Sequence, residues 1–232
     1  MTSQPAPFVI AIDGPSGSGK SSVSRAVATR LGAGYLDTGA MYRALTWWCR
    51  HTEVDLGDAA AITAAAVALP LDIGDDPQAP SVTVDGTDVA ADIRTSEISS
   101  LVSTVATVPD VRVEMQRRQR ALIDDIAARH GACVAEGRDV TTVIAPEASV
   151  RILLTASEQA RLRRRSLEVH GATDEAAIAA TRDQVVRRDR DDSTVSQFTE
   201  AADGVTVVDT SDLDFAGSID AVMSLVDAAR GR

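Results

Sequence analysis

Eight consecutive residues near the start of the chain have the types and spacing of a phosphate-binding loop. They run from Gly14 to Ser21 and read GPSGSGKS, which fits the pattern G-x-x-x-x-G-K-[ST]. The glycines let the backbone curl so that successive N–H groups point inward at phosphate oxygens. In this pattern Lys20 reaches the β- and γ-phosphates, and the Ser21 hydroxyl binds Mg²⁺. Lys20 is the only lysine among 23 lysines and arginines, which suits a role for a compact ammonium on a flexible stem.

The segments around this loop are those that a phosphate site needs. The apolar run at residues 8–12 predicts a strand, and residues 21–31 predict a helix with one apolar face. The positive end of that helix would lie directly behind the phosphates. A flexible Gly/Ser linker is the alternative, but it would not be enclosed by a strand and a helix. The residues predicted to bind nucleotide phosphates are Gly14, Pro15, Ser16, Gly17, Ser18, Gly19, Lys20, Ser21 and Ser22, with Ser21 as the metal ligand.

Two arginine clusters flank a predicted loop near Gly171. They comprise Arg161, Arg163, Arg164 and Arg165 before it, and Arg187, Arg188 and Arg190 after it. We interpret residues of about 160–192 as a mobile lid that closes on a polyphosphate, with Arg161 and Arg164 binding the phosphates. The alternative is a solvated helical face whose arginines pair with nearby acidic residues. Arg43 and Arg138 follow predicted strand ends, where they could bind a second phosphate or form surface ion pairs.

The composition is that of a globular protein of ordinary size. The chain has 232 residues, of which 44% are hydrophobic and 25% charged. Its net charge of −11 argues against a nucleic-acid or membrane partner. Cys49 and Cys133 stand in unrelated contexts, so neither a disulfide framework nor a zinc site is suggested. Because the start is not basic and no apolar run is long, we expect a cytoplasmic protein. We also expect it to be a monomer.

Short apolar strands alternate with helical segments, which predicts an α/β fold with a five-stranded parallel sheet covered by helices. The strands are expected at residues 8–12, 34–36, 132–135, 150–154 and 205–208. Ligands of such sheets gather beyond the carboxyl ends of the strands. We therefore place Asp13 with its loop, Asp37 with Thr38, and residues 136–139 around one crevice. A fourth polar cluster, at residues 209–210, could be only a helix-capping loop.

Residues 70–95 differ from the rest of the chain. Short apolar stretches at residues 71–73, 81–84 and 87–89 are interrupted by Gly and Pro, and Asp85-Gly86 predicts a turn. We interpret this segment as a small antiparallel insert. The chain then divides into a core of residues 1–69 and 96–232 and an insert of residues 70–95. Core helices are expected at residues 40–51, 58–69, 96–107, 109–129, 157–169, 174–189 and 215–230.

With these segments in order, the sequence resembles the bacterial cytidylate kinases over most of its length. The matching stretches are IDGPSGSGKSS at residues 12–22, LDTGAMYR at 36–43, DIRT at 92–95, EGRD at 136–139, and RRD followed by DS within 187–193. Many families share the first stretch, whereas LDTGAMYR and a GRD after a strand are more specific. The insert matches the family's extra segment that binds the nucleoside monophosphate (NMP). The resemblance implies a P-loop NMP kinase that transfers the γ-phosphoryl of ATP, with Mg²⁺, to CMP or dCMP, giving ADP and CDP or dCDP.

The resemblance also implies roles for individual residues. Those implied to bind CMP are Ser16, Arg43 and Arg138 at its phosphate, Ser103, Arg112 and Asp139 at the cytosine, and Arg188 and Asp192 at the sugar and phosphate side, with Asp37, Thr38 and Tyr42 beside them. Those implied to be catalytic are Lys20, Arg138 and Arg188. A carboxylate at residue 139 would accept from the cytosine amine and would face the uracil carbonyl unfavourably.

Two positions depart from the family pattern. Val195 stands where a sugar-binding arginine is usual, and Thr141 stands where glycine usually follows GRD. We expect these departures to alter affinity and sugar preference but not the reaction, and Arg190 is the candidate to replace the missing arginine.

Several other functions compete with this interpretation. A GTPase is excluded because the chain has no Asn and no second Lys for an Asn-Lys-x-Asp motif. A dinucleotide-binding oxidoreductase is excluded because Gly17 and Gly19 are not followed by the third glycine. Another small P-loop kinase, of uridylate, adenylate or shikimate type, stays open, as does a non-catalytic nucleotide-binding module.

Overall fold

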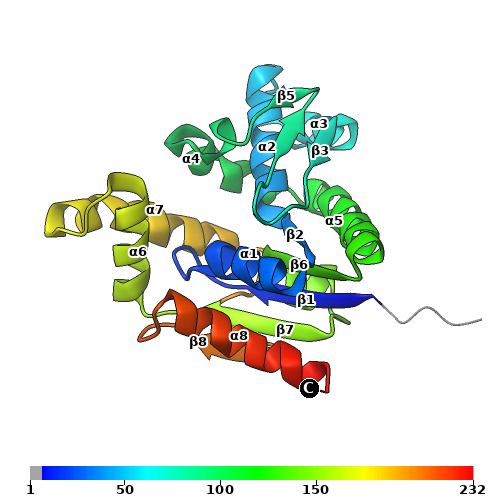
Figure 1. Cartoon of the computed structure of the whole chain (residues 1–232). Helices are drawn as coiled ribbons and strands as arrows, with labels where there is room; N and C mark the ends of the chain where they lie inside the picture. The colour runs from blue at the N-terminus through cyan, green and yellow to red at the C-terminus, as the bar shows by residue number, and fades with distance from the viewer. Residues whose placement is uncertain (1–6, 232) are drawn as a thin grey trace, which may run out of the picture.

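A five-stranded parallel sheet forms the centre of the molecule (Figure 1). The computed structural model describes residues 7–231, except for the side chains of residues 168–170, 183–184 and 187–188. The strand order is β2-β6-β1-β7-β8, and every neighbouring pair is parallel. The strands are β2 Gly34–Asp37, β6 Ala132–Gly137, β1 Phe8–Asp13, β7 Val150–Thr155 and β8 Thr206–Asp209. The predicted α/β fold with a five-stranded parallel sheet is confirmed.

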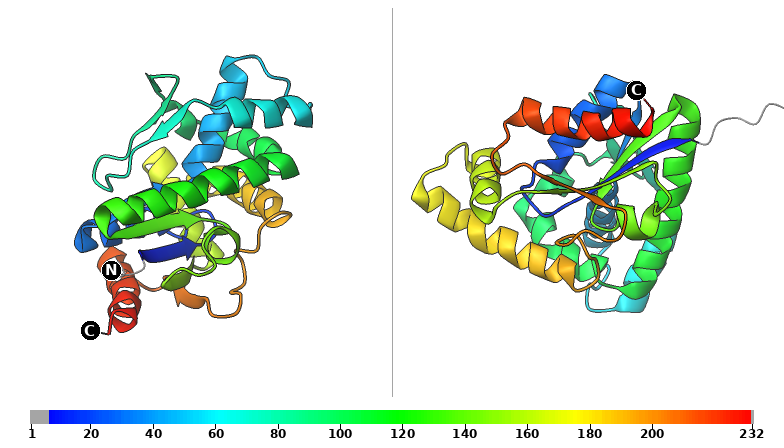
Figure 2. Two further views of the ribbon diagram at one scale, coloured as in Figure 1. Left: turned by 90° about the vertical axis from the view of Figure 1, so that its right-hand side faces the viewer. Right: turned by 90° about the horizontal axis from the view of Figure 1, so that it is seen from below.

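Side chains of β1 alternate between two apolar clusters, one on each face of the sheet. Val9 and Ala11 belong to the cluster under α2 Thr38–His51 and α5 Pro109–His130. Ile10 and Ile12 belong to the cluster under α1 Lys20–Leu31 and α8 Phe215–Ala229. Successive side chains of a strand point to opposite faces, so both faces of this central strand are buried by helices. Figure 2 shows α5 and α8 on opposite sides of the sheet.

A second, antiparallel sheet lies at the end of the molecule that carries α2, α3 Ala59–Ala68 and α4 Ser96–Ala106 (Figure 1). Its strands are β3 Leu71–Ile73, β4 Val82–Val84 and β5 Thr87–Asp88. The turn between β4 and β5 has positive φ at Asp85 (50°) and Gly86 (75°), as a two-residue type I′ hairpin requires. The small antiparallel sheet and its turn are confirmed, whereas a substrate-binding role for residues 70–95 stays a prediction.

The α6 Glu158–His170 and α7 Glu175–Ser193 helices form a hairpin beside the loop that follows β1 (Figure 1). Gly171 ends α6 in a left-handed conformation with φ of 67°, which glycine adopts without steric cost. This helix pair was expected from the sequence, and its mobility as a lid stays a prediction. No helix within residues 7–231 is long and apolar enough to cross a membrane.

Two short elements were not expected from the sequence. A 3₁₀-helix, η1, spans Asp92–Arg94, and a π-helix, η2, spans Val140–Ile144. The second element follows directly after residues 136–139, at the carboxyl end of β6. It therefore helps to set the positions of the polar residues there.

Candidate active site

The carboxyl ends of β1, β2 and β6 open into one cavity, which also receives side chains from α4, α5, α6 and the end of α7. Its lining residues are Ser16, Gly17, Gly19, Lys20, Ser21, Ser22, Asp37, Thr38, Gly39, Tyr42, Arg43, Arg94, Val102, Ala106, Arg112, Glu136, Gly137, Arg138, Asp139, Arg165, Asp192, Val195 and Ser196. The three polar clusters that we expected around one crevice are therefore together.

Glycine is required where the phosphate-binding loop packs against its neighbours. A Cβ on Gly14 would lie 2.1 Å from the carbonyl oxygen of Leu154. Gly17 has φ of 76°, and a Cβ there would lie 2.6 Å from the carbonyl oxygen of Arg161. Only glycine lets the loop approach β7 and α6 so closely. The N-cap of α1 is Gly19, which has no side chain to bond the first N–H groups of the helix, and a helix N-terminus of this kind attracts an anion.

Behind this loop, two side chains donate to the buried carboxylate of Glu136. Ser21 Oγ donates to Oε2 at 2.9 Å, and Tyr35 Oη donates to Oε1 at 2.5 Å. Burial raises the pKa of Glu136, the nearby charge of Asp37 raises it further, and the Lys20 ammonium opposes both. A hydroxyl beside a carboxylate is the kind of oxygen set that Mg²⁺ prefers.

Asp37 holds the start of α2 and one of the predicted substrate arginines. Its Oδ1 accepts from the Ala40 N–H at 2.9 Å, and its Oδ2 accepts from Arg43 Nη2 at 2.7 Å. Arg94 approaches the same carboxylate at 3.8 Å. Burial acts to raise the pKa of Asp37, but the charges of Arg43 and Arg94 outweigh it and hold the pKa below its ordinary value. The pair therefore stays charged inside the cavity wall.

Three donors in the cavity wall are buried without a hydrogen-bond partner among the described residues. They are Tyr42 Oη, Arg43 Nε and Arg138 Nε. Leaving a buried polar group unsatisfied costs about 1–3 kcal/mol, and more when it is charged. Arg138 Nε lies 3.4 Å from Asp192 Oδ2, an ion-pair contact that offsets part of this cost. Tyr42 Oη and Arg43 Nε are therefore the two that best suit an anionic ligand able to accept from them.

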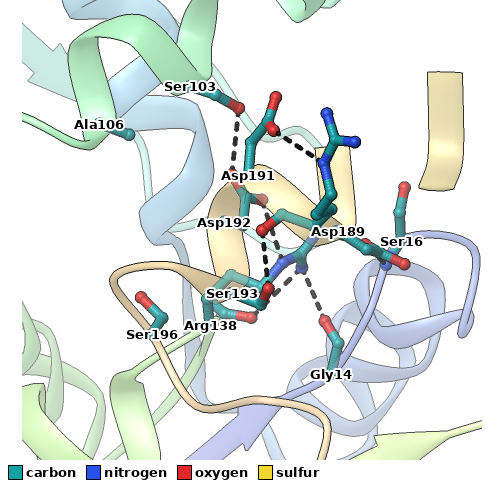
Figure 3. A network of polar contacts seen from close by, with 12 residues as sticks. Gly14, Ser16, Ser103, Ala106, Arg138, Asp189, Asp191, Asp192, Ser193 and Ser196 are labelled. Atoms are coloured by element: carbon teal, nitrogen blue, oxygen red, sulfur yellow. Dashed lines mark hydrogen bonds and ion pairs between the residues drawn. The ribbon is translucent and has the colours of Figure 1, made fainter. Parts of the chain in front are cut away.

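Arg138 lies at the centre of a polar network that joins the phosphate-binding loop to α7 (Figure 3). Its Nη1 donates to the Gly14 carbonyl at 2.7 Å, its Nε lies 3.4 Å from Asp192 Oδ2, and its Nη2 lies 3.9 Å from Asp189 Oδ1. Asp189 also accepts from the Ser16 N–H at 2.9 Å and pairs with Arg161. The end of α7 is thereby attached to the loop.

Arg112 and Asp139, which both line the cavity, form an ion pair that is largely removed from solvent. Arg112 Nη2 lies 2.5 Å from Asp139 Oδ2 and donates to Ser196 Oγ at 3.1 Å. Burial raises the pKa of Asp139, and the Arg112 charge opposes that shift. Ser103, which was predicted to contact the cytosine, does not line the cavity. Its Oγ donates to Asp192 Oδ1 at 3.2 Å, and Val102 and Ala106 are the α4 residues that line the cavity.

A buried carboxylate holds the turn on which Asp139 sits. Asp13 accepts from the Val140 N–H at 3.0 Å, from the Thr141 N–H at 2.8 Å and from Thr141 Oγ1 at 2.6 Å. Burial raises the pKa of Asp13 to about 6 even though these donors oppose the shift. Thr141, which departs from the usual glycine, therefore adds a hydroxyl donor to the anchor of η2.

Comparison with known proteins identifies the family. The cytidylate kinase family model matches residues 10–228. A cytidylate kinase from Streptomyces avermitilis is 48% identical over 224 residues, which cover 96% of this chain and 94% of that protein. This chain belongs to the cytidylate kinase family. A cytidylate kinase from Nocardia farcinica is also 48% identical, with 97% of this chain and 95% of that protein covered.

One solved structure of low sequence identity has a similar fold. An uncharacterized protein from Eubacterium ventriosum matches with a TM-score of 0.52 at 12% identity, over 95% of this chain and 99% of that one. At this identity the match concerns the fold alone.

The predicted lid arginines of this cytidylate kinase family member differ in their contacts. Arg161 Nη1 donates to the Ser16 carbonyl at 2.9 Å, and Arg164 donates to the Ser18 carbonyl at 3.2 Å and to the Thr210 carbonyl at 2.6 Å. Arg161 and Arg164 therefore contact carbonyl groups of the phosphate-binding loop and do not line the cavity, whereas Arg165 lines it.

Besides Ser103, Arg161 and Arg164, five other residues predicted to bind substrates are not placed in the cavity lining. The side chain of Arg188 is not among the described residues. Arg190 is 75% exposed and pairs with Asp191, outside the cavity lining. Gly14, Pro15 and Ser18 belong to the phosphate-binding loop but do not line the cavity.

Sequence reasoning placed residues 136–139 at one crevice but gave no individual role to several residues at this cavity. Glu136, Arg165 and Ser196 line it, and Asp189 joins the loop to α7. Glu136 carried a signal, since it ends a buried strand beside the other predicted site residues. Arg165 was in a recognised cluster, but the sequence did not show which member faces the cavity.

Proposed function

We propose that this protein transfers the γ-phosphoryl group of ATP to CMP or dCMP. The observation that carries the proposal is that the phosphate-binding loop and the buried Arg112–Asp139 pair line one cavity. The loop suits a polyphosphate, and the pair offers a carboxylate of the kind that accepts from the cytosine amine. The two substrates would therefore meet between them.

Different residues of the cavity would bind ATP, bind CMP and stabilise the transferring phosphoryl group. Lys20 and the loop N–H groups would bind the ATP phosphates, and the guanidinium groups of Arg43 and Arg138, which line the cavity, would bind the CMP phosphate. Arg165, in the cavity wall, would stabilise charge on the transferring phosphoryl group. A CMP phosphate oxygen then forms a bond to the γ-phosphorus as the bond to the ADP oxygen breaks.

Ser21 and Glu136 fit a magnesium ion that arrives with ATP. The hydroxyl and the carboxylate lie 2.9 Å apart at the foot of the loop, and both are hard oxygen donors. When bound, Mg²⁺ would neutralise negative charge on the β- and γ-phosphates. A cation here would also offset the electrostatic cost of a second buried carboxylate beside Asp37.

The test is ADP release from ATP and Mg²⁺ with each nucleoside monophosphate in turn, and with shikimate. We expect CMP and dCMP to give the highest kcat/KM, and Lys20→Ala to abolish the reaction. A preference for UMP, AMP or shikimate would assign the chain to another small kinase type. Nucleotide binding without ADP release would indicate a non-catalytic binding module. The monomeric state and the cytoplasmic location stay predictions.

A further inference from the structure

Phe198 is buried outside the two apolar clusters that flank the five-stranded sheet. Its side chain is fully buried at 0% exposure. Yet within the described part of the chain it belongs to neither of the apolar clusters that flank the sheet. It follows α7 and lies three residues after Val195, one of the positions that depart from the family pattern.

The ring of Phe198 lies against the guanidinium of Arg138. The Cζ atom of Arg138 lies 4.9 Å from the ring centroid, within the distance at which the negative face of an aromatic ring attracts a cation. The edge of the same guanidinium approaches the Gly14 carbonyl, Asp192 and Asp189 (Figure 3). The guanidinium of Arg138 therefore contacts the Phe198 ring with one face and oxygen atoms along its edge.

We propose that Phe198 is a positioning residue that fixes the Arg138 guanidinium for the acceptor phosphate. An aromatic face orients a planar cation without using any of its N–H donors. The edge of the guanidinium thereby stays directed at oxygens: Nε, which makes no hydrogen bond in the described structure, lies 3.4 Å from Asp192 Oδ2. A carboxylate in place of the ring would also orient the guanidinium, but it would compete with the phosphate for the donors. This inference rests on the proposed CMP kinase activity.

The alternative is that Phe198 only fills space. Leucine at this position would remove the ring, but Phe198→Leu also leaves a cavity and could fail to fold. Phenylalanine analogues with one, two and three ring fluorines separate the two roles, because fluorine withdraws charge from the ring face and changes the shape little. Arg230 provides a matched control, since its Cζ lies 4.6 Å from the ring of Phe8, at the start of β1.

We expect kcat/KM for CMP to fall stepwise with each fluorine at residue 198, by about 2- to 30-fold in total. The Kd for ATP and the thermal midpoint should change little, because the ring's shape and burial are retained. The same series at residue 8 should leave kcat/KM unchanged. Phe198→Leu should lose at least as much activity as the trifluorinated ring.

Three results would overturn the proposal. They are a flat kcat/KM across the residue 198 series, an equal loss in the residue 8 series, or a loss that follows the thermal midpoint. These outcomes are distinct from failure of the proposed function, because the unsubstituted protein is assayed first. An inactive parent refutes the CMP kinase activity, whereas an active parent with a flat series refutes only the role of Phe198.

Discussion

Replacing Asp139 by asparagine should remove the preference for cytosine over uracil. Asp139 is buried and bonded to Arg112 at 2.5 Å, so its position is fixed before substrate enters. The carboxylate can only accept, which matches the cytosine amine and opposes the uracil O4. An asparagine amide of the same shape can donate to O4 instead. The change therefore alters the chemistry of the contact while it keeps its geometry.

The size of the effect follows from the loss of one charged hydrogen bond. Such a bond contributes about 1.5–3 kcal/mol, so kcat/KM for CMP should fall roughly 10- to 150-fold. The value for UMP should hold or rise, because a repulsive contact becomes a donor. Asparagine still offers Arg112 an acceptor, so the fall in unfolding free energy should stay below the approximately 3–5 kcal/mol that follows when a buried ion pair is broken.

The assay is steady-state ADP release with CMP and with UMP, alongside chemical denaturation of each variant. Glu114→Gln is the control, because Glu114 lies on the same helix as Arg112, pairs with Arg117 and Arg118, and does not line the cavity. The control should leave the CMP:UMP ratio unchanged. If Asp139→Asn lowers both values equally, the residue supports structure and does not read the base.

Four further predictions concern other parts of the cavity. Lys20→Ala should abolish turnover with an unchanged circular dichroism spectrum, and kcat within a few-fold of the parent would contradict its role. Val195→Arg should lower the KM for CMP roughly tenfold with kcat little changed, because the side chain lines the cavity; an unchanged KM would show that this segment does not reach CMP. Glu136→Gln should raise the Mg²⁺ concentration for half-maximal activity roughly tenfold, and an unaltered titration would exclude it from the metal site. Burial raises the pKa of Asp13 from its ordinary 3.8 to about 6 in the folded protein. The folded state therefore binds this proton more tightly, and the resulting contribution to the free energy of unfolding is complete below pH 3.8 and is lost as pH rises through 6. Denaturation at several pH values should show the parent losing about 3 kcal/mol relative to Asp13→Asn across that window, and parallel curves would contradict this.

The sheet and the phosphate-binding loop could be predicted because their signals are local. The spacing of Gly14, Gly19 and Lys20 encodes the loop by itself, and the apolar runs encode the strands. The order of the strands could not be predicted from such signals, because it depends on which strand ends pair across long separations. The polar residues after β1, β2 and β6 could still be grouped, since the carboxyl ends of parallel strands share one edge.

The inner surface of the cavity depends on rotations that the sequence does not show. Residues of a helix turn by about 100° each, so Arg164 and Arg165, three and four residues after Arg161, both lie near its face of α6, and helix geometry alone does not separate their roles. Only the packing of α6 against the loop decides that Arg161 and Arg164 contact loop carbonyls and that Arg165 reaches the cavity. Similarly, η2 forms because the buried Asp13 accepts its N–H groups, a long-range contact that leaves no local pattern.

Direct identification of the phosphorylated product tests the proposed reaction most directly. The protein is incubated with Mg²⁺, ATP labelled at the γ-phosphate, and equal concentrations of CMP, dCMP, UMP, AMP and GMP, and the labelled products are separated. We expect the label to appear mainly in CDP and dCDP, and to appear in none of the products with Lys20→Ala. Label mainly in UDP, GDP or newly formed ADP, or only in free phosphate, would contradict the assignment.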